Sequence, residues 1–161
     1  MKTEKAIFAA GCFWHVQYNF DLIKGVIKTT VGYINGDEKR YPNPNYEMIH
    51  KDKTGYVEAV EVIFNPKIVS YEKLLENFWN MHNPTFQNRQ GFDFGSQYQA
   101  GIFYLNENQK KLAEKSKKEI EKRLFPKKIY TVIKKAGTFF VAEGYHQKYF
   151  EKTGANACSV K

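Results

Sequence analysis

The sequence is poor in cysteine: two thiols occur among 161 residues, at Cys12 and Cys158, near opposite ends of the chain. It contains no CxxC pair and no cysteine–histidine cluster with the spacing of a zinc site. The four histidines show neither HxxxH nor HExxH spacing. The sequence therefore gives no support to a metal site.

Long apolar runs are missing as well. The first residues, MKTEK, do not begin an export signal, and no run approaches the length of a membrane-spanning segment. We therefore expect a cytoplasmic protein that binds no membrane. In that compartment a lasting structural disulfide would be reduced, so a bond between the two thiols would be transient and part of a reaction cycle.

The chain also lacks repeats and low-complexity tracts. With 161 residues it can form one domain with a real core but not two, so we expect a single catalytic domain over residues 1–161. Aromatic residues are abundant, with 13 Phe and 11 Tyr, and most of these rings are expected in that core.

The net charge of +8 raises the question of a nucleic-acid partner. The lysines concentrate between residues 110 and 135, where they alternate with Glu114, Glu119 and Glu121. Such alternation is typical of the solvated face of a helix. We therefore favour a protein without a nucleic-acid partner, and an RNA-binding module is the alternative.

The stretch around Cys12 predicts a strand followed by a helix. Residues 5–10 form a short apolar run, and apolar residues then recur at helical spacing from residue 13 to residue 23. Unpaired backbone N–H groups and the helix dipole favour a thiolate at the first turn of such a helix. We therefore expect the pKa of Cys12 below the value of about 8.5 for a free cysteine. The alternative is a small buried cysteine that fills the core.

Strands and helices alternate along the rest of the chain. Strands are expected at residues 26–33, 57–64, 99–104 and 130–135. Helices are expected after the capping residues Ser70 and Asn106. The long segments 34–54 and 82–97 are expected to be functional loops. This order predicts an α+β fold, a ferredoxin-like split βαβ sandwich with an additional helix and strand and an irregular C-terminal tail from about residue 137.

One carboxyl group stands out within the strand at residues 57–64. Strand alternation places Glu58 on the same face as Val60, Val62 and Phe64. Burial among such neighbours raises the pKa of a carboxyl, so Glu58 can be held as a neutral acid. The alternative is that Glu58 lies at the rim of the strand with its charge in water.

Other polar residues allow more than one role. His82 and His146 can each serve as a base or as a structural histidine. Asp93 lies between two phenylalanines and two glycines, where it can cap backbone amides or bind another group. Tyr46 and Tyr98 each end a long loop and offer a hydroxyl as well as a ring.

A set of segments, in one order along nearly the whole chain, resembles the A-type peptide methionine sulfoxide reductases. These segments are GCFW at 11–14, GY at 32–33, NPNY at 43–46, TGYVEAV at 54–60, residues 71–79, HNPT at 82–85, QGFDFGSQY at 90–98 and HQ at 146–147. A lone GCFW is moderately specific, whereas the ordered set is highly specific.

The resemblance implies reduction of methionine S-sulfoxide, free and in proteins, with Cys12 as the nucleophile. Phe13 and Trp14 would form the apolar slot for the methyl group of the substrate. Cys12 would become a sulfenic acid, Cys158 would resolve it as a disulfide, and a thioredoxin-like protein would reduce that disulfide. This repair of oxidised proteins would need no metal or organic cofactor, and we expect a monomer.

The resemblance also implies roles for four residues around the oxygen of the sulfoxide. Glu58 would protonate this oxygen, Tyr46 and Tyr98 would hold it through their hydroxyls, and Asp93 would orient the site. The chemistry agrees, because this oxygen is a poor leaving group until it is protonated and gains negative charge as the thiolate attacks.

Some positions depart from the pattern of the family. His15 replaces the usual glycine after GCFW, and an imidazole there could contact Cys12 or narrow the slot. A cysteine hydrolase or transferase, with His15 or His82 as its base, is therefore the second alternative function, and it would not need Cys158.

Overall fold

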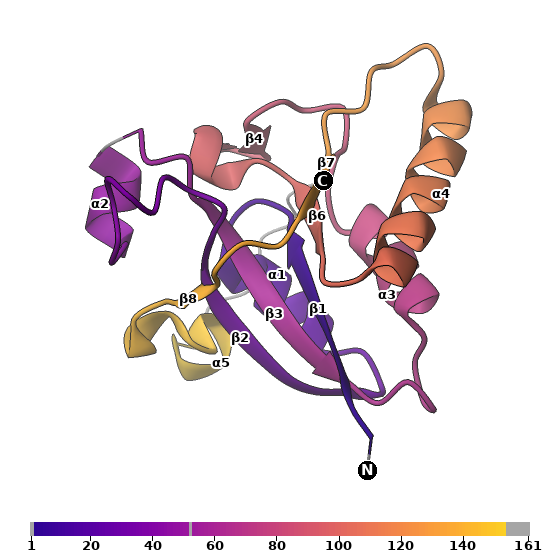
Figure 1. The fold of residues 1–161 in the computed structure, drawn as a ribbon, viewed down its shortest axis with the longest axis horizontal. Helices are drawn as coiled ribbons and strands as arrows, with labels where there is room; N and C mark the ends of the chain where they lie inside the picture. The colour runs from indigo at the N-terminus through magenta and orange to yellow at the C-terminus, as the bar shows by residue number, and fades with distance from the viewer. Residues whose placement is uncertain (1, 52, 154–161) are drawn as a thin grey trace.

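The computed structural model describes residues 2–51 and 53–153, which fold around a six-stranded sheet (Figure 1). Its strands are β1 (Glu4–Ala9), β2 (Val26–Ile34), β3 (Val57–Phe64), β6 (Gly101–Tyr104), β7 (Val132–Lys135) and β8 (Phe140–Val141). They lie in the order β7-β6-β1-β3-β2-β8. Neighbouring strands are antiparallel, apart from β6 and β7, which are parallel.

The predicted split βαβ arrangement is confirmed. Helix α1 (Phe13–Asp21) connects β1 to β2, and helix α3 (Tyr71–Asn80) follows β3, which lies between β1 and β2. The ring of Phe8 in β1 stacks on Phe20 of α1 at 5.0 Å and on Phe78 of α3 at 5.2 Å. Both helices therefore pack on the same face of the sheet, where their apolar side chains form the main core.

The additional helix α4 (Glu107–Leu124) and strand β7 are also confirmed. The side chain of Asn106 accepts a hydrogen bond from the backbone N–H of Gln109, and Ser70 caps α3 in the same way through Lys73. Helix α4 buries Ala113 but leaves most of its lysines exposed, as their alternation with glutamates predicts. Among the described residues, no helix combines the length and the apolarity needed to cross a membrane.

The described part of the predicted irregular tail, residues 137–153, contains three short elements: strand β8, the 3₁₀ helix η2 (Gly144–His146) and helix α5 (Tyr149–Thr153). Both predicted loops also contain short elements. These are helix α2 (Tyr46–Lys51), the hairpin of β4 (Arg89–Gln90) and β5 (Asp93–Phe94), and the 3₁₀ helix η1 (Ser96–Tyr98). Elements this short contain too few residues to show a periodic pattern of apolar side chains in the sequence. They form because contacts with distant segments hold them in place.

Candidate active site

Cys12 lies at the turn between β1 and α1, as predicted, and occupies the N-cap position of α1. The preceding Gly11 has a φ of +91°, and a Cβ at this position would lie 2.6 Å from the Cβ of Gln90. Only glycine fits this conformation and this close approach without strain. The turn therefore brings the hairpin of β4 and β5 directly against the residue that precedes the thiol.

The expectation of a low pKa for Cys12 is wrong for the substrate-free protein. Burial, followed by the charge of Glu58, raises the pKa of Cys12 to about 12, although the backbone N–H groups of Trp14 and His15 act to lower it. The N–H groups at the helix terminus lower the pKa of Cys12, as predicted, but the removal of the thiolate from water raises this pKa by more. Cys12 therefore rests as a thiol, and it must lose its proton when substrate binds.

Glu58 is buried in the middle of the fold, with 1% of its side chain exposed, so it does not lie at a solvated rim. Its Oε1 accepts a hydrogen bond of 3.1 Å from the backbone N–H of Phe13, the residue that follows Cys12. Burial, with a smaller contribution from the charge of Asp93, raises the pKa of Glu58 to about 8. The hydrogen bond from the Phe13 N–H acts in the opposite direction and lowers this pKa. At neutral pH the carboxyl is therefore a neutral acid, held next to the nucleophile.

His50 lies beside the carboxyl of Glu58, although its spacing from the other histidines in the sequence did not indicate a role in the site. Its Nε2 lies 3.5 Å from Oε2 of Glu58 and 3.0 Å from the hydroxyl of Tyr98. Its Nδ1 lies 2.8 Å from the carbonyl oxygen of Tyr46, which can only accept, so Nδ1 carries the hydrogen. Helix α2 thus brings an imidazole between the carboxyl of β3 and the phenol of η1.

Tyr46 and Tyr98, which come from the two predicted loops, therefore both lie next to His50. Burial, followed by the charge of Glu58, raises the pKa of Tyr46 to about 12 and also raises the pKa of Tyr98. Both residues thus keep their phenolic hydrogens and can donate them. Asp93 pairs with Gln90 in the hairpin that lies against Gly11, and its charge acts to raise the pKa of both tyrosines, of Cys12 and of Glu58.

Phe13 and Trp14 differ in their surroundings. Phe13 is fully buried and packs on Tyr33 and His146, with ring centroids 5.7 and 5.2 Å apart. Trp14 is half-buried, and its indole N–H donates a hydrogen bond of 2.9 Å to Nδ1 of His146. Tyr149 of helix α5 stacks on the indole at 3.8 Å. The segment after residue 137 thus packs against the predicted methyl-binding residues.

Glu143 is a further residue that the sequence did not single out. Its carboxylate accepts hydrogen bonds from the Tyr33 hydroxyl at 2.9 Å and from the backbone N–H of Tyr46 at 3.1 Å. The side chain of Gln147 adds hydrogen bonds to both the N–H and the carbonyl of Val31. These polar groups fix residues 143–147 to β2 and hold Tyr46 at the start of α2.

The structure argues against His82 as a catalytic base. His82 is buried, with its ring nitrogens 2.8 Å from the carbonyl oxygen of Phe78 and from the hydroxyl of Thr131. Burial lowers the pKa of His82 to about 4. The side chain of His15 bonds to Asn19 within the same helix. His82 is therefore structural, which removes one base of the hydrolase alternative.

Two further predictions concern Cys158 and metals. Cys158 lies outside the described residues, so its role as resolving thiol stays a prediction. Within residues 2–51 and 53–153, no group of three or more His, Cys, Asp or Glu side chains is arranged to hold a metal ion.

Comparisons with known proteins show the family to which this chain is similar. The family model described as peptide methionine sulfoxide reductase matches residues 4–161. A peptide methionine sulfoxide reductase MsrA from Methanococcus maripaludis is 51% identical over 150 residues, which cover 93% of each chain. The reduced form of Mxr1 from Saccharomyces cerevisiae superimposes with a TM-score of 0.91 and 32% identity, over 98% of this chain and 90% of that one.

A second Mxr1 structure, in complex with Trx2, matches with a TM-score of 0.64 and 23% identity, over 92% of this chain and 85% of that one, which shows a shared fold. The family model and the archaeal relative each extend over nearly the whole sequence. This chain belongs to the peptide methionine sulfoxide reductase family.

Proposed function

We propose that this protein reduces methionine S-sulfoxide, free and in proteins, through attack of Cys12 on the sulfoxide sulfur. The observation that carries this proposal is the position of Glu58, a buried neutral acid whose Oε1 is bonded to the residue next to the nucleophile. A sulfoxide needs both groups, a sulfur nucleophile and a proton donor for its oxygen.

The proposed reaction balances in protons and electrons. Glu58 gives its proton to the sulfoxide oxygen while the sulfur of Cys12 attacks, and the hydrogen lost by the thiol replaces the one that Glu58 gave. The hydroxyl then moves from the substrate sulfur to the sulfur of Cys12, so that the S–O bond and the newly formed S–S bond both break; Cys12 is left as a sulfenic acid and the methionine leaves as a thioether. Two electrons pass from the cysteine sulfur to the sulfoxide sulfur.

The phenols of Tyr46 and Tyr98 fit the charge that develops in this step. Negative charge grows on the sulfoxide oxygen, where hydroxyl donors in a partly dry site stabilise it more than water does. Both tyrosines lie close enough to Glu58 for its charge to raise their pKa values. Asp93 would orient the bound substrate, and Phe13 and Trp14 would receive its methyl group.

Regeneration of the thiol would use Cys158 and a dithiol protein. Cys158 would attack the sulfenic acid, release water and form a disulfide with Cys12, which a thioredoxin-like protein would reduce by exchange. The complex of yeast Mxr1 with Trx2 supports a reductant of this class. Such a cycle belongs in a reducing compartment, so we infer a cytoplasmic location.

The test is a comparison of the wild type with Cys12→Ser on the separate S and R epimers of methionine sulfoxide, with dithiothreitol as reductant. We expect the wild type to form methionine from the S epimer and the variant to form none. Methionine formation by Cys12→Ser, or equal use of the R epimer by the wild type, would overturn the proposal.

A further inference from the structure

The hairpin of β4 and β5 forms part of the rim around Cys12. Its residue Gln90 packs against Gly11, and the charge of Asp93 reaches the thiol, where it raises the pKa of Cys12. The hairpin is therefore placed where it can contact a polypeptide that presents a side chain to Cys12.

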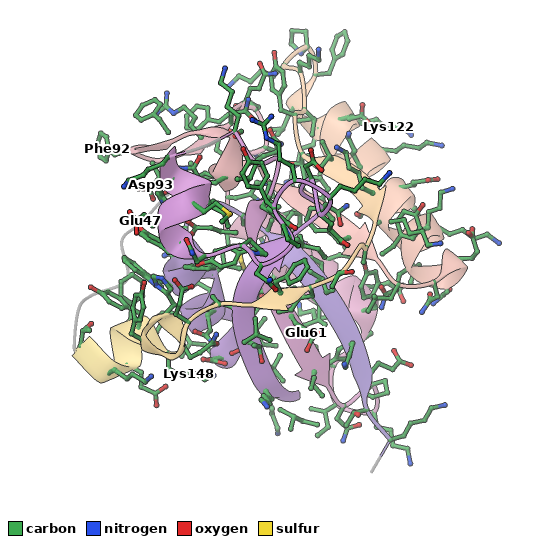
Figure 2. All side chains as sticks on the ribbon, turned by 60° about the vertical axis from the view of Figure 1, so that its left-hand side comes forward. Glu47, Glu61, Phe92, Asp93, Lys122 and Lys148 are labelled. Carbon is green, nitrogen blue, oxygen red and sulfur yellow. The ribbon has the colours of Figure 1, made fainter. Side chains whose placement is uncertain are left out.

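The tip of the hairpin carries two exposed phenyl rings, Phe92 and Phe94, on either side of Asp93. Phe92 is 96% exposed and Phe94 is 63% exposed. Figure 2 shows Phe92 at the outer edge of the molecule, pointing away from the body of the fold, with Asp93 beside it. The guanidinium of Arg89 lies 4.7 Å from the ring of Phe94 and supports it. A ring as exposed as that of Phe92 adds almost nothing to the fold through burial.

We propose that Phe92, supported by Phe94, binds apolar side chains that flank the methionine sulfoxide of a polypeptide substrate. This inference rests on the proposed function and deepens it, because it names the class of polypeptide that the site prefers. Free methionine sulfoxide has no flanking residues, so the hairpin would contribute to peptide substrates alone.

The chemistry of oxidised proteins favours such a substrate. Oxidation turns an apolar methionine into a polar side chain and disrupts the core or interface that contained it. The neighbours of that methionine are apolar and lose their packing partners, so they are available to an exposed aromatic ring.

The experiment compares wild type and Phe92→Ser with dithiothreitol as reductant, on three substrates. These are free methionine S-sulfoxide, a short peptide with leucine and phenylalanine beside the sulfoxide, and the same peptide with glycine and serine there. We expect kcat/KM for the apolar peptide to fall about tenfold, as for a lost aromatic anchor of modest strength. The other two substrates should change less than about twofold.

Two matched variants control for a general effect of losing a ring. Phe125→Ser removes a ring that is 81% exposed after the end of α4, and Figure 2 places the nearby Lys122 on the side opposite Phe92. This variant should leave all three substrates unchanged. Phe92→Leu, which keeps an apolar side chain, should retain most of the preference for the apolar peptide.

Three results would overturn the inference. An equal fall on free sulfoxide and peptide would assign Phe92 to the reacting centre, and unchanged kinetics on all substrates would leave it without a role in binding. If the assays are repeated with thioredoxin in place of dithiothreitol, a loss seen only with thioredoxin would assign the hairpin to the reductant. Cys12→Ser, assayed in parallel, separates these results from a failure of the proposed function, because activity in that variant would discard the function itself.

Discussion

The imidazole of His50 lies beside the carboxyl of Glu58, with 3.5 Å between Nε2 and Oε2. Because Nδ1 donates to a carbonyl oxygen, Nε2 is the nitrogen that shares a hydrogen with the Tyr98 hydroxyl. A neutral His50 accepts that hydrogen from Tyr98. His50 thus links the hydroxyl of Tyr98 to the place in the site where the carboxyl of Glu58 lies.

Replacement of His50 by leucine should slow methionine formation in a single turnover by about tenfold, a smaller loss than removal of the acid itself. The expected cause is that Tyr98 and Glu58 lose the group that positions their hydrogens. Rapid-quench measurement of the first turnover between pH 6 and 9 should show a changed pH profile as well as a lower rate. Glu47→Gln, an exposed change on the same helix, is the control. A His50→Leu variant with the wild-type rate and profile would show that His50 is only structural.

Glu58→Gln should reduce the single-turnover rate by about 10²–10⁴, which is the usual contribution of a general acid. Glutamine keeps the shape of the side chain and can still accept the hydrogen bond from the Phe13 N–H. The loss of rate would therefore measure the contribution of the proton that Glu58 donates to the sulfoxide oxygen. An unimpaired first turnover in this variant would remove the acid assignment.

The wild-type rate should fall as pH rises through about 8, the pKa to which burial raises Glu58. Below this pH the carboxyl holds the proton that the sulfoxide oxygen needs, and above it the carboxylate cannot donate. Ionisation of Cys12 would increase the rate as pH rises, so a rate that falls with rising pH identifies the acid Glu58. The measurement is the single-turnover rate against pH, and the fall should be absent in Glu58→Gln.

The same carboxyl should make the fold less stable as pH rises. Its pKa is about 8 in the folded protein against 4.5 for an exposed glutamate, so the folded state holds a proton that the unfolded chain has released. Its contribution to stability is complete below pH 4.5 and is lost as pH rises through about 8. Burial lowers the pKa of His82 from 6.5 to about 4, which acts in the opposite direction below pH 6.5.

The window from pH 6.5 to 8 therefore isolates Glu58. Across it the free energy of unfolding should fall by about 2 kcal/mol, at 1.36 kcal/mol for each pH unit. Urea titration of the wild type and of Glu58→Gln would measure this fall, which the variant should lack. Parallel curves for the two proteins would mean that Glu58 is ionised in the folded state.

Cys158→Ser should leave one equivalent of methionine per enzyme and stop cycling with thioredoxin, because the sulfenic acid would have no second thiol to attack it. Product counting with thioredoxin, and mass spectrometry for a Cys12–Cys158 disulfide in the wild type, would check this. Continued cycling in the variant would show a direct route from the sulfenic acid to the reductant.

Local patterns predicted the elements that carry the chemistry. The apolar run before Gly11 and the helical spacing after it located Cys12, and alternation in β3 put Glu58 on the apolar face, one of the two positions that the sequence left open. These signals are readable because each element buries a regular set of side chains in the core.

The remaining features depend on contacts between segments far apart in the sequence. Glu143 bonds to Tyr46 across 97 positions and His50 to Tyr98 across 48, so no local pattern could reveal either pair. The pKa of Cys12 was mispredicted for the same reason. The helix terminus that lowers it is a local feature, whereas the burial that raises it comes from segments packed around the turn.

The hydrogen bond from Phe13 to Glu58 has a mechanical consequence. Phe13 adjoins Cys12 in the chain, so a single peptide unit separates the sulfur-bearing residue from the amide that anchors the acid. The spacing between thiol and carboxyl is therefore governed by one hydrogen bond between β3 and the first turn of α1, and a change that breaks this bond would alter the alignment of the two reacting groups.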